Sequence, residues 1–598
     1  MADKKRTPIK YTSRDFESIK QDLIDYARRY YPEVYRDFNE ASFGSLMIDT
    51  VAYVGDILSF YLDYQVNESF LDSAAEYDNV RRLARQLGYK PAGAPSSTGV
   101  VSFYIVVPAN SVGLGPDSTY LPILKRGSTL SSLGGAIFTL NSDVDFSNSN
   151  VEVIVAQTDP TSGVPTSYAL KTEGTVVSGR IVQENFTIGA YERFRKLALS
   201  LPRVTEVISV TDSEGREYYE VDYLSQDVVY RDVINRQSDS EFVPSILRPY
   251  SVPRRYVVES TGDISFLQFG YGTGDESSEA TPVDPSNVVL QQHAKEYITD
   301  RTFDPSRLVS SDKFGVAPSN TVLTITYRTN VLDEVNVSAG SLVNISNPQF
   351  SFQNITQLNS STVLEVQQSL EVYNTDPILG DTTEPSAEEI RRRAIDFFAA
   401  QNRAVTKEDY ESLAYSMDKK FGSVKRCSVI QDPTSFKRNL NMYVLSEGAG
   451  GKLSLPTSTI KNNLKTWLNM KKMINDTIDI IDGKIVNIGI EFEIIHDLNY
   501  NKFDVLNRCV NELRKRFADP GLIGEPFYIT DVYNYLNDVI GVIDTTKVNI
   551  TNLQGGQYSD TFLDIDSMLS ADGRYVKCPL NAAFEIKFPS LDIKGSVK

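Results

Sequence analysis

Three aspartates, Asp49, Asp56 and Asp63, are the first residues in this sequence whose spacing suggests chemistry. They recur every seven residues, so a helix would carry them on one face, and paired carboxylates perform acid–base chemistry in glycosidases. A seven-residue step along a helix spans about 10.5 Å, more than the ~5–9.5 Å that separates catalytic carboxylates. We therefore expect a polar stripe, either paired with the arginines of residues 81–85 or facing another chain.

The other candidate sites lack the residue pattern that their chemistry needs. The chain has two histidines, His293 and His496, and no CxxC, HExxH or calcium-loop motif. Glycines alternate over residues 270–274, but neither the longer gap nor the helix start of a nucleotide-binding loop follows them. We interpret this segment as a turn after a strand at 264–269. The sequence thus predicts no catalytic, cofactor-binding or metal-binding residues, and no enzyme.

Length and charge restrict the remaining classes. A chain of 598 residues is too long for one hydrophobic core, so several domains are expected. The net charge of −18 argues against nucleic acid as a partner, because phosphate binding needs clustered Lys and Arg. Three scattered cysteines do not make a disulfide framework. With no signal peptide and no run of 18 apolar residues, we expect a protein made in the cytoplasm without membrane insertion.

Residues 39–91 are predicted to hold the helices around which the chain is organised. Apolar residues recur at three- and four-residue steps from 43 to 62. A second apolar run ends at Gly88, after a capping box of Ser73 and Glu76. We interpret the two runs as a helical hairpin that cannot cover both of its apolar faces without a partner. The predicted protein interface consists of Phe43, Met47, Val51, Val54, Leu58, Tyr61, Phe70, Leu83 and Leu87.

The composition changes after a linker at 92–97 and again after Pro385. Apolar residues alternate from Val101 to Val107 and from Leu323 to Tyr327, which is typical of strands in sandwich or barrel-like modules. Helices and strands mix thereafter. The sequence predicts a multidomain α+β protein, divided into a helical N-terminal region (1–95), β-rich middle domains (96–380), an α+β domain (381–480) and a self-associating C-terminal α+β domain (481–598).

Several motifs, taken in order, resemble one known family. They are residues 67–71 (NESFL), 83–91 (LARQLGYKP), 125–129 (KRGST), 269–272 (FGYG) and 403–410 (RAVTKEDY). Together they resemble the baseplate J-like wedge proteins of contractile-tailed bacteriophages, including the T-even type. One residue departs from the pattern: Tyr271 stands where the family commonly has aspartate.

The resemblance implies a structural function in the virion. Proteins of this kind pair with a second copy of themselves, and their N-terminal helices join helices of other wedge subunits in a shared bundle. Neighbouring wedges then form a ring around the central hub that transmits the rearrangement of contraction. The resemblance implies assembly in the host bacterial cytoplasm and no cofactor.

Two alternatives stay open at the level of sequence. A receptor- or glycan-binding tail component would suit the 10% aromatic content and the loop-rich middle of the chain. A carbohydrate hydrolase would need carboxylates from the β-rich region and a measurable turnover.

Overall fold

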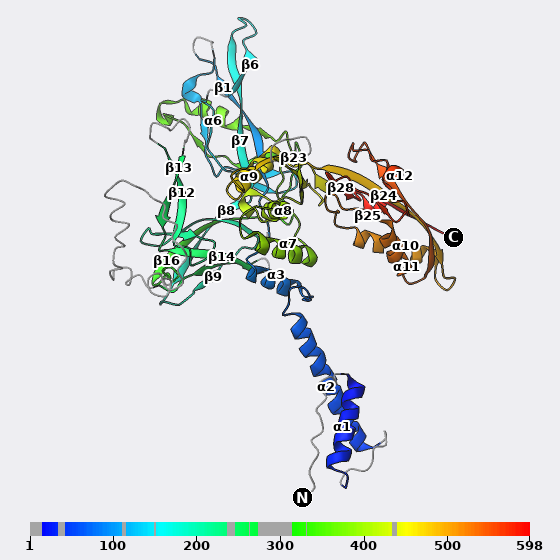
Figure 1. Cartoon of the computed structure of the whole chain (residues 1–598). Coiled ribbons are helices and arrows are strands. Elements are labelled where there is room, and N and C mark those ends of the chain that lie inside the picture. Colours follow the sequence, from blue (N-terminus) through cyan, green and yellow to red (C-terminus); the bar gives the residue numbers. More distant parts are fainter. Residues whose placement is uncertain are drawn as a thin grey trace. The chain divides into compact units, whose positions relative to one another are not determined.

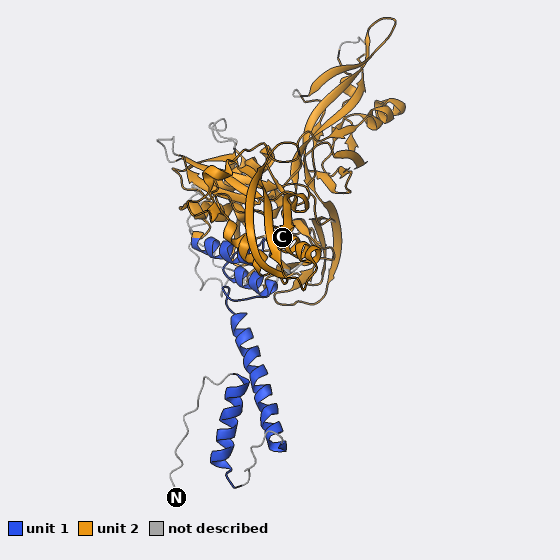
Figure 2. Cartoon of the chain, turned by 90° about the vertical axis from the view of Figure 1, so that its right-hand side faces the viewer, with its two compact units in different colours: residues 1–91, 385–399 blue, residues 92–384, 400–598 orange. Residues whose placement is uncertain are grey.

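The computed structural model shows a multidomain α+β chain, as the sequence predicts (Figure 1). It divides into two compact units, of which unit 1 comprises residues 1–91 and 385–399 and unit 2 comprises residues 92–384 and 400–598 (Figure 2). The four-part division made from the sequence stays a prediction. The structure describes residues 15–33, 42–91, 93–110, 115–148, 151–235, 245–261, 264–272, 314–330, 332–432 and 439–598.

Unit 1 is helical. Its described elements are α1 (Phe16–Tyr30), α2 (Phe43–Asn67), α3 (Tyr77–Gln86) and α7 (Ala387–Ala400). Asp15 caps α1 by accepting the Ser18 N–H, and Ser42 caps α2 by accepting the Ser45 N–H. These caps satisfy N–H groups that have no partner inside a helix, and they fix where each helix begins.

The core of unit 1 lies between α3 and α7. Val80, Ala84, Ile390 and Ala394 are fully buried there. Arg391 of α7 donates to the carbonyls of the segment just before α3, including that of Leu71 at 2.8 Å. The apolar face of α3 is therefore covered by a helix that follows it by some 300 residues of sequence.

The first sheet of unit 2 has seven strands in the order β17-β3-β4-β7-β1-β19, with β6 paired to β7. Val101, Phe103, Ile105 and Val107 of its long strand β1 are fully buried, as their alternation predicts. Helix α6 (Ser360–Gln368) and a small sheet of β2 (Ile123–Leu124), β5 (Val144–Asp145) and β18 (Phe350–Ser351) adjoin the same core. The seven strands are β1 (Thr98–Pro108), β3 (Thr129–Ser132), β4 (Ile137–Leu140), β6 (Glu152–Thr158), β7 (Pro165–Ser178), β17 (Leu342–Asn347) and β19 (Glu371–Tyr373).

The second sheet also has seven strands, in the order β8-β16-β10-β11-β14-β15-β9. Leu323, Ile325 and Tyr327 of β16 are fully buried, which confirms the predicted strand. A separate two-stranded ribbon joins β12 (Val228–Ile234) to β13 (Ser245–Ser251). The seven strands are β8 (Arg180–Ile188), β9 (Lys196–Ala198), β10 (Val204–Thr211), β11 (Glu217–Glu220), β14 (Arg255–Thr261), β15 (Ile264–Phe269) and β16 (Thr321–Thr329).

The rest of unit 2 mixes strands with covering helices. Thr406 and Asp409 form a capping box at the start of α8. In the first of two cores, the Trp467 indole donates to the Leu413 carbonyl at 2.8 Å. The elements of this core are α8 (Lys407–Tyr415), β20 (Arg426–Gln431), β21 (Asn439–Glu447), β22 (Leu453–Ser454), α9 (Ser458–Asn469) and β23 (Thr477–Asp482).

The last core is built around the central strand β24, whose residues Ile488, Ile490, Phe492 and Ile494 are buried. Its partners are one antiparallel strand, β26, and two parallel strands, β28 and β29. The elements are β24 (Lys484–His496), α10 (Lys502–Arg516), β25 (Phe527–Tyr528), α11 (Ile529–Asn537), β26 (Val542–Leu553), α12 (Ile565–Met568), β27 (Tyr575–Val576), β28 (Ala582–Glu585), α13 (Pro589–Asp592) and β29 (Ile593–Val597).

Candidate interaction surface on the N-terminal helices

One face of α2 carries large apolar side chains that this chain leaves exposed. We call the set the α2 seam: Met47, Val51, Val54, Leu58 and Tyr61, which are 51%, 52%, 49%, 57% and 59% exposed. Their spacing is 4-3-4-3, the 3.5-residue period with which helices interlock side chains in coiled coils. The α2 seam therefore has the spacing of side chains that pack between two helices, but these side chains are about half exposed in this chain.

The opposite face of α2 is used by α1 and is built from small residues. Ser45 and Ala52 are the buried residues of the helix. Gly55 lets α1 approach closely, because a Cβ added there would lie 3.3 Å from Cδ1 of Ile19. Small side chains allow two helices to pack at short range, so α1 occupies this face and leaves the α2 seam open.

Outside the α2 seam, α2 exposes further large apolar side chains besides its three aspartates. Exposed apolar patches of this kind mark interaction sites. By length and composition α2 could cross a membrane, but it carries three aspartates, of which the central one, Asp56, would cost about 2.5–3.5 kcal/mol at a bilayer centre. The further exposed side chains are Leu46, Tyr53, Phe60, Leu62 and Val66.

The joint between α2 and α3 is organised by Glu68. Its buried carboxylate accepts the Ala75 N–H at 2.7 Å and the Asn79 side-chain amide at 2.8 Å. The hydrogen bond from Asn79, followed by that from Ala75, holds the pKa of Glu68 below its usual value. The predicted capping box is wrong: α3 begins at Tyr77, and the Ser73 hydroxyl donates to the Asn67 carbonyl instead.

The predicted hairpin between α2 and α3 is also wrong. The helix that packs along α2 is α1, while α3 packs against α7; Figure 2 shows α1 and α2 side by side. The sequence pattern gave the apolar faces but not which helix covers each one. Glu68 lies in the joint, where the apolar periodicity breaks, so that periodicity carries no signal for its role.

The nine predicted interface residues fall into two groups. Leu83 and Leu87 are half-buried and pack against the core shared by α3 and α7. The other seven are exposed: beyond the α2 seam, these are Phe43 at 76% and Phe70 at 61%. The role of all nine in an interface stays a prediction.

Asp49, the first aspartate of the stripe, is paired differently from the sequence-based expectation. The Asp49 carboxylate lies 2.9 Å from the Lys20 ammonium of α1. An arginine of the returning helix, Arg81, is buried and lies over the Tyr77 ring, with 5.8 Å between its guanidinium carbon and the ring centroid. The expected pairing of Asp49 with these arginines is therefore wrong, because α1 and not α3 runs along that face of α2.

The other candidates for chemistry, the glycine segment and the histidines, make ordinary structural contacts where the structure describes them. Gly270 forms the turn after β15, where an added Cβ would lie 2.2 Å from the Gly315 carbonyl oxygen; residues 273–274 lie outside the described part. His496 Nδ1 is 3.3 Å from the Lys598 carbonyl, and His293 is not among the described residues. Within the described ranges, no three His, Cys, Asp or Glu side chains gather as metal ligands do.

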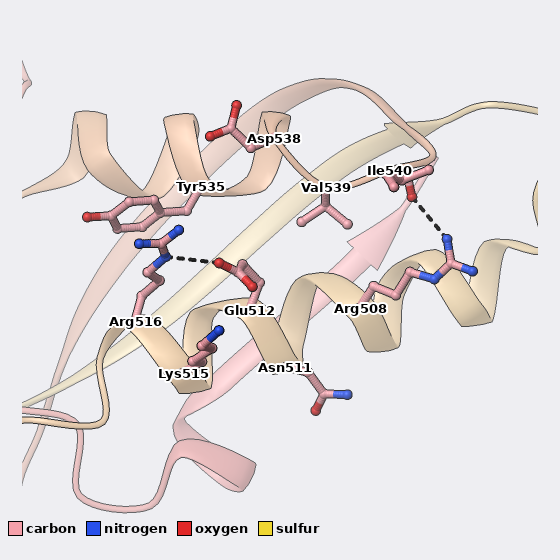
Figure 3. A pocket seen from close by; sticks show the side chains of 9 residues that line it. All are labelled: Arg508, Asn511, Glu512, Lys515, Arg516, Tyr535, Asp538, Val539 and Ile540. Carbon is pink, nitrogen blue, oxygen red and sulfur yellow. Dashed lines mark hydrogen bonds and ion pairs between the residues drawn. The ribbon is translucent and has the colours of Figure 1, made fainter. Parts of the chain in front are cut away.

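A surface groove of about 610 Å³ lies between α10 and α11 (Figure 3). The Arg516 guanidinium pairs with Glu512 at 2.9 Å and lies 4.9 Å from the centroid of the Tyr535 ring. Arg508 donates to the Ile540 carbonyl at 3.3 Å. The Arg516–Glu512 pair lies along α10 and Arg508 binds a backbone carbonyl, so these groups do not converge on a common point as the groups of a ligand site do.

The helices that carry the α2 seam have a recognised counterpart. Residues 15–86 match the family described as bacteriophage baseplate protein, N-terminal domain. The matched range runs from the N-cap of α1 to the end of α3 and contains the whole α2 seam. The N-terminal part of the chain is thus similar to a baseplate domain, and a structural component of a baseplate is the coarse function that the comparisons support.

Two solved structures are also similar, each at 9% identity. A chain of the anti-feeding prophage baseplate, from a 6-fold symmetrised cryo-EM structure, aligns over 89% of this chain and 86% of its own, with a TM-score of 0.23. A chain of the TssK-TssF-TssG baseplate subcomplex of the type VI secretion system aligns over 73% and 96%, with a TM-score of 0.25. These scores are too low to support a functional argument. No curated protein matches the chain.

Proposed function

We propose that this chain is a structural, non-catalytic wedge subunit of a contractile phage tail baseplate. The observation that carries the proposal is the α2 seam: five regularly spaced apolar side chains, each about half exposed, within the range that matches a baseplate domain. Helices from other chains complete this face. The partners are a second copy of the chain and other wedge subunits, each contributing an apolar helix to a shared bundle.

The size of the seam argues for a bundle with several partners. Full burial of one such side chain is worth about 1.5–3 kcal/mol, so the remaining half of five is worth on the order of 4–8 kcal/mol on this chain, and an equal seam on the partner adds about the same. Association itself costs about 4–15 kcal/mol. The seam alone therefore supports only a weak pair. A stable complex also needs the other exposed side of α2, including Leu46, Tyr53 and Phe60.

The rest of the proposal follows the resemblance to baseplate J-like wedge proteins. Wedges join through C-terminal domains into a ring around the central hub, and the ring transmits the rearrangement of contraction. The protein assembles in the host cytoplasm and is incorporated into the virion tail without a cofactor, nucleic acid or membrane insertion. Turnover of a glycan by the purified chain would contradict the structural role.

The test is co-expression of the full chain with the neighbouring tail gene products, followed by affinity purification and cryo-EM of the complex. Leu58→Glu places a charge in the centre of the α2 seam and is expected to abolish co-purification. Leu498→Glu, at a leucine that is 91% exposed in unit 2, is the matched control and should co-purify like the wild type. Retention of partners by Leu58→Glu would overturn the proposal.

A further inference from the structure

Strand β6 is a bare edge of the first sheet. Among the described strands it pairs with β7 alone, and Figure 1 shows it beside β7. All seven of its residues are exposed, including Val153 at 46%, Ile154 at 65% and Val155 at 45%. Natural edge strands are usually blunted by lysine, proline or a covering element. Within the described residues the Val153–Val155 part of β6 has none of these, although a bulge disturbs the pairing after Val155.

The register of β7 shows which way the backbone groups of the edge point. Alternate residues of a strand direct their N–H and C=O groups to opposite sides. The Ala109 N–H donates to the Thr166 carbonyl at 2.9 Å, so the even-numbered residues of β7 face β1. The Asn141 N–H donates to the Thr175 carbonyl at 3.0 Å, so the odd-numbered residues face the side where β4 and β6 lie.

The free hydrogen-bonding groups of β6 follow from this register. Ile154 is opposite Ala169, an odd-numbered residue of β7, so the Ile154 N–H and C=O are directed into the β6–β7 ribbon. Val153 and Val155 therefore direct their N–H and C=O groups to the outer edge. A further strand that continues the sheet has the geometry to form hydrogen bonds with the N–H and C=O groups of both Val153 and Val155.

We propose that β6 pairs antiparallel with β6 of a second copy of this chain, about a two-fold axis through Ile154. The segment Val153-Ile154-Val155 reads the same in both directions, as an isologous contact requires. Each Val153 then forms a hydrogen-bonded pair with Val155 of the other copy, and the two Ile154 residues form the close pair between them.

The charges around β6 permit this arrangement. Glu152 is opposite Ala156 of the second copy and is already paired with Lys171 of its own chain at 3.3 Å. No like charges are therefore set directly opposite one another, a placement that destabilises strand pairs. The contact uses neither α2 nor any other part of unit 1, so it goes beyond the proposed bundle and does not depend on it.

The first test is disulfide crosslinking of the full chain. In the proposed pairing the two Ile154 Cα atoms lie about 4.5 Å apart, within the range that a disulfide spans. Ile154→Cys is expected to give a dimer under mild oxidation. The control is Gln157→Cys, on the same exposed strand, whose two copies would be about 20 Å apart because six residues separate them. Wild-type protein reports any crosslinking through the native cysteines.

The second test is sedimentation of full-length protein that carries Leu58→Glu, which removes the contribution of the α2 seam. In that background Ile154→Lys is expected to weaken self-association by at least about tenfold, because it sets two like charges opposite each other. Val164→Lys, in the loop of the same hairpin, should leave self-association unchanged. A monomer in the Leu58→Glu background, equal crosslinking at residues 154 and 157, or crosslinking to a different protein would overturn the self-pairing of β6.

Discussion

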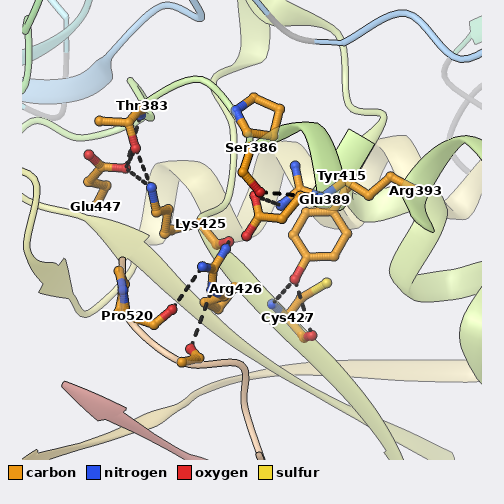
Figure 4. A network of polar contacts seen from close by, with 12 residues as sticks. Thr383, Ser386, Glu389, Arg393, Tyr415, Lys425, Arg426, Cys427, Glu447 and Pro520 are labelled. Atoms are coloured by element: carbon orange, nitrogen blue, oxygen red, sulfur yellow. Dashed lines mark hydrogen bonds and ion pairs between the residues drawn. The ribbon is translucent and has the colours of Figure 1, made fainter. Parts of the chain in front are cut away.

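At the scale of single residues, a buried polar network joins strands of unit 2 and supports a quantitative prediction. The Lys425 ammonium and the Glu447 carboxylate are 2.9 Å apart, with 8% and 4% of their side chains exposed, and Glu447 also accepts the Thr383 N–H (Figure 4). Lys425→Met leaves a buried carboxylate without its counter-charge, which costs about 3–5 kcal/mol. Urea unfolding should show this cost as a lower free energy of unfolding of unit 2.

The matched control is Lys461→Met, which removes a lysine from the partly exposed pair with Asp482. Exposed pairs contribute at most about 1 kcal/mol, so this variant should unfold nearly like the wild type. Equal losses in the two variants would contradict the claim that burial makes the Lys425–Glu447 pair important.

The second residue-scale prediction concerns Asp381. Burial raises the pKa of this carboxyl to about 7, while the unfolded chain ionises it near 3.8. Folding therefore favours the protonated form, and stability from this residue declines as pH rises from about 4 to about 7. Asp381→Asn keeps an acceptor for the Val335 N–H and removes the charge. Asp381→Asn should melt at a higher temperature than the wild type at pH 8 and at a similar temperature at pH 4. The control Asp560→Asn, at an exposed position, should leave the melting temperature unchanged at both pH values.

At the scale of elements, the packing of α1 on α2 depends on Gly55. Gly55→Leu places a side chain where Ile19 now lies, and overpacking of this kind costs about 1–3 kcal/mol. Amide exchange in α1 should accelerate by about tenfold, since 1.4 kcal/mol corresponds to a factor of ten. Thr50→Leu adds the same side chain at an exposed position of α2 and should leave exchange in α1 unchanged. Unchanged exchange in Gly55→Leu would show that α1 does not rely on this approach.

The same elements show what sequence can and cannot predict. The alternation of Leu323 with Ile325 predicts strand β16 correctly because its signal acts within a few residues. Sequence does not predict which element covers an apolar helix face, because α3 is covered by Ile390, about 300 residues away. The lysine that pairs with Asp49 likewise comes from an element whose position the local pattern does not encode. Exposure of the α2 seam is a property of the whole chain and is visible only in the fold.

At the scale of the whole molecule, the two units differ in how much of their apolar surface the chain itself covers. Strands β1, β16 and β24 lie in filled cores, whereas α1 has no buried residue and α2 has two. Few buried contacts mean a low free energy of local opening. In the isolated chain, amides of α1 and α2 should exchange with solvent faster than those of the three strands.

Assembly should reverse this difference. When other helices cover the α2 seam, exchange in α2 should slow by several orders of magnitude, because opening then also requires dissociation of the bundle. Exchange in β16 and β24 serves as the internal control, since their cores are complete before assembly and should exchange at the same rate in both states. Mass spectrometry of the isolated and the co-purified chain measures both. Slow exchange of α2 in the isolated chain would mean that the helix already has its partner, and the bundle proposal would fail on that result.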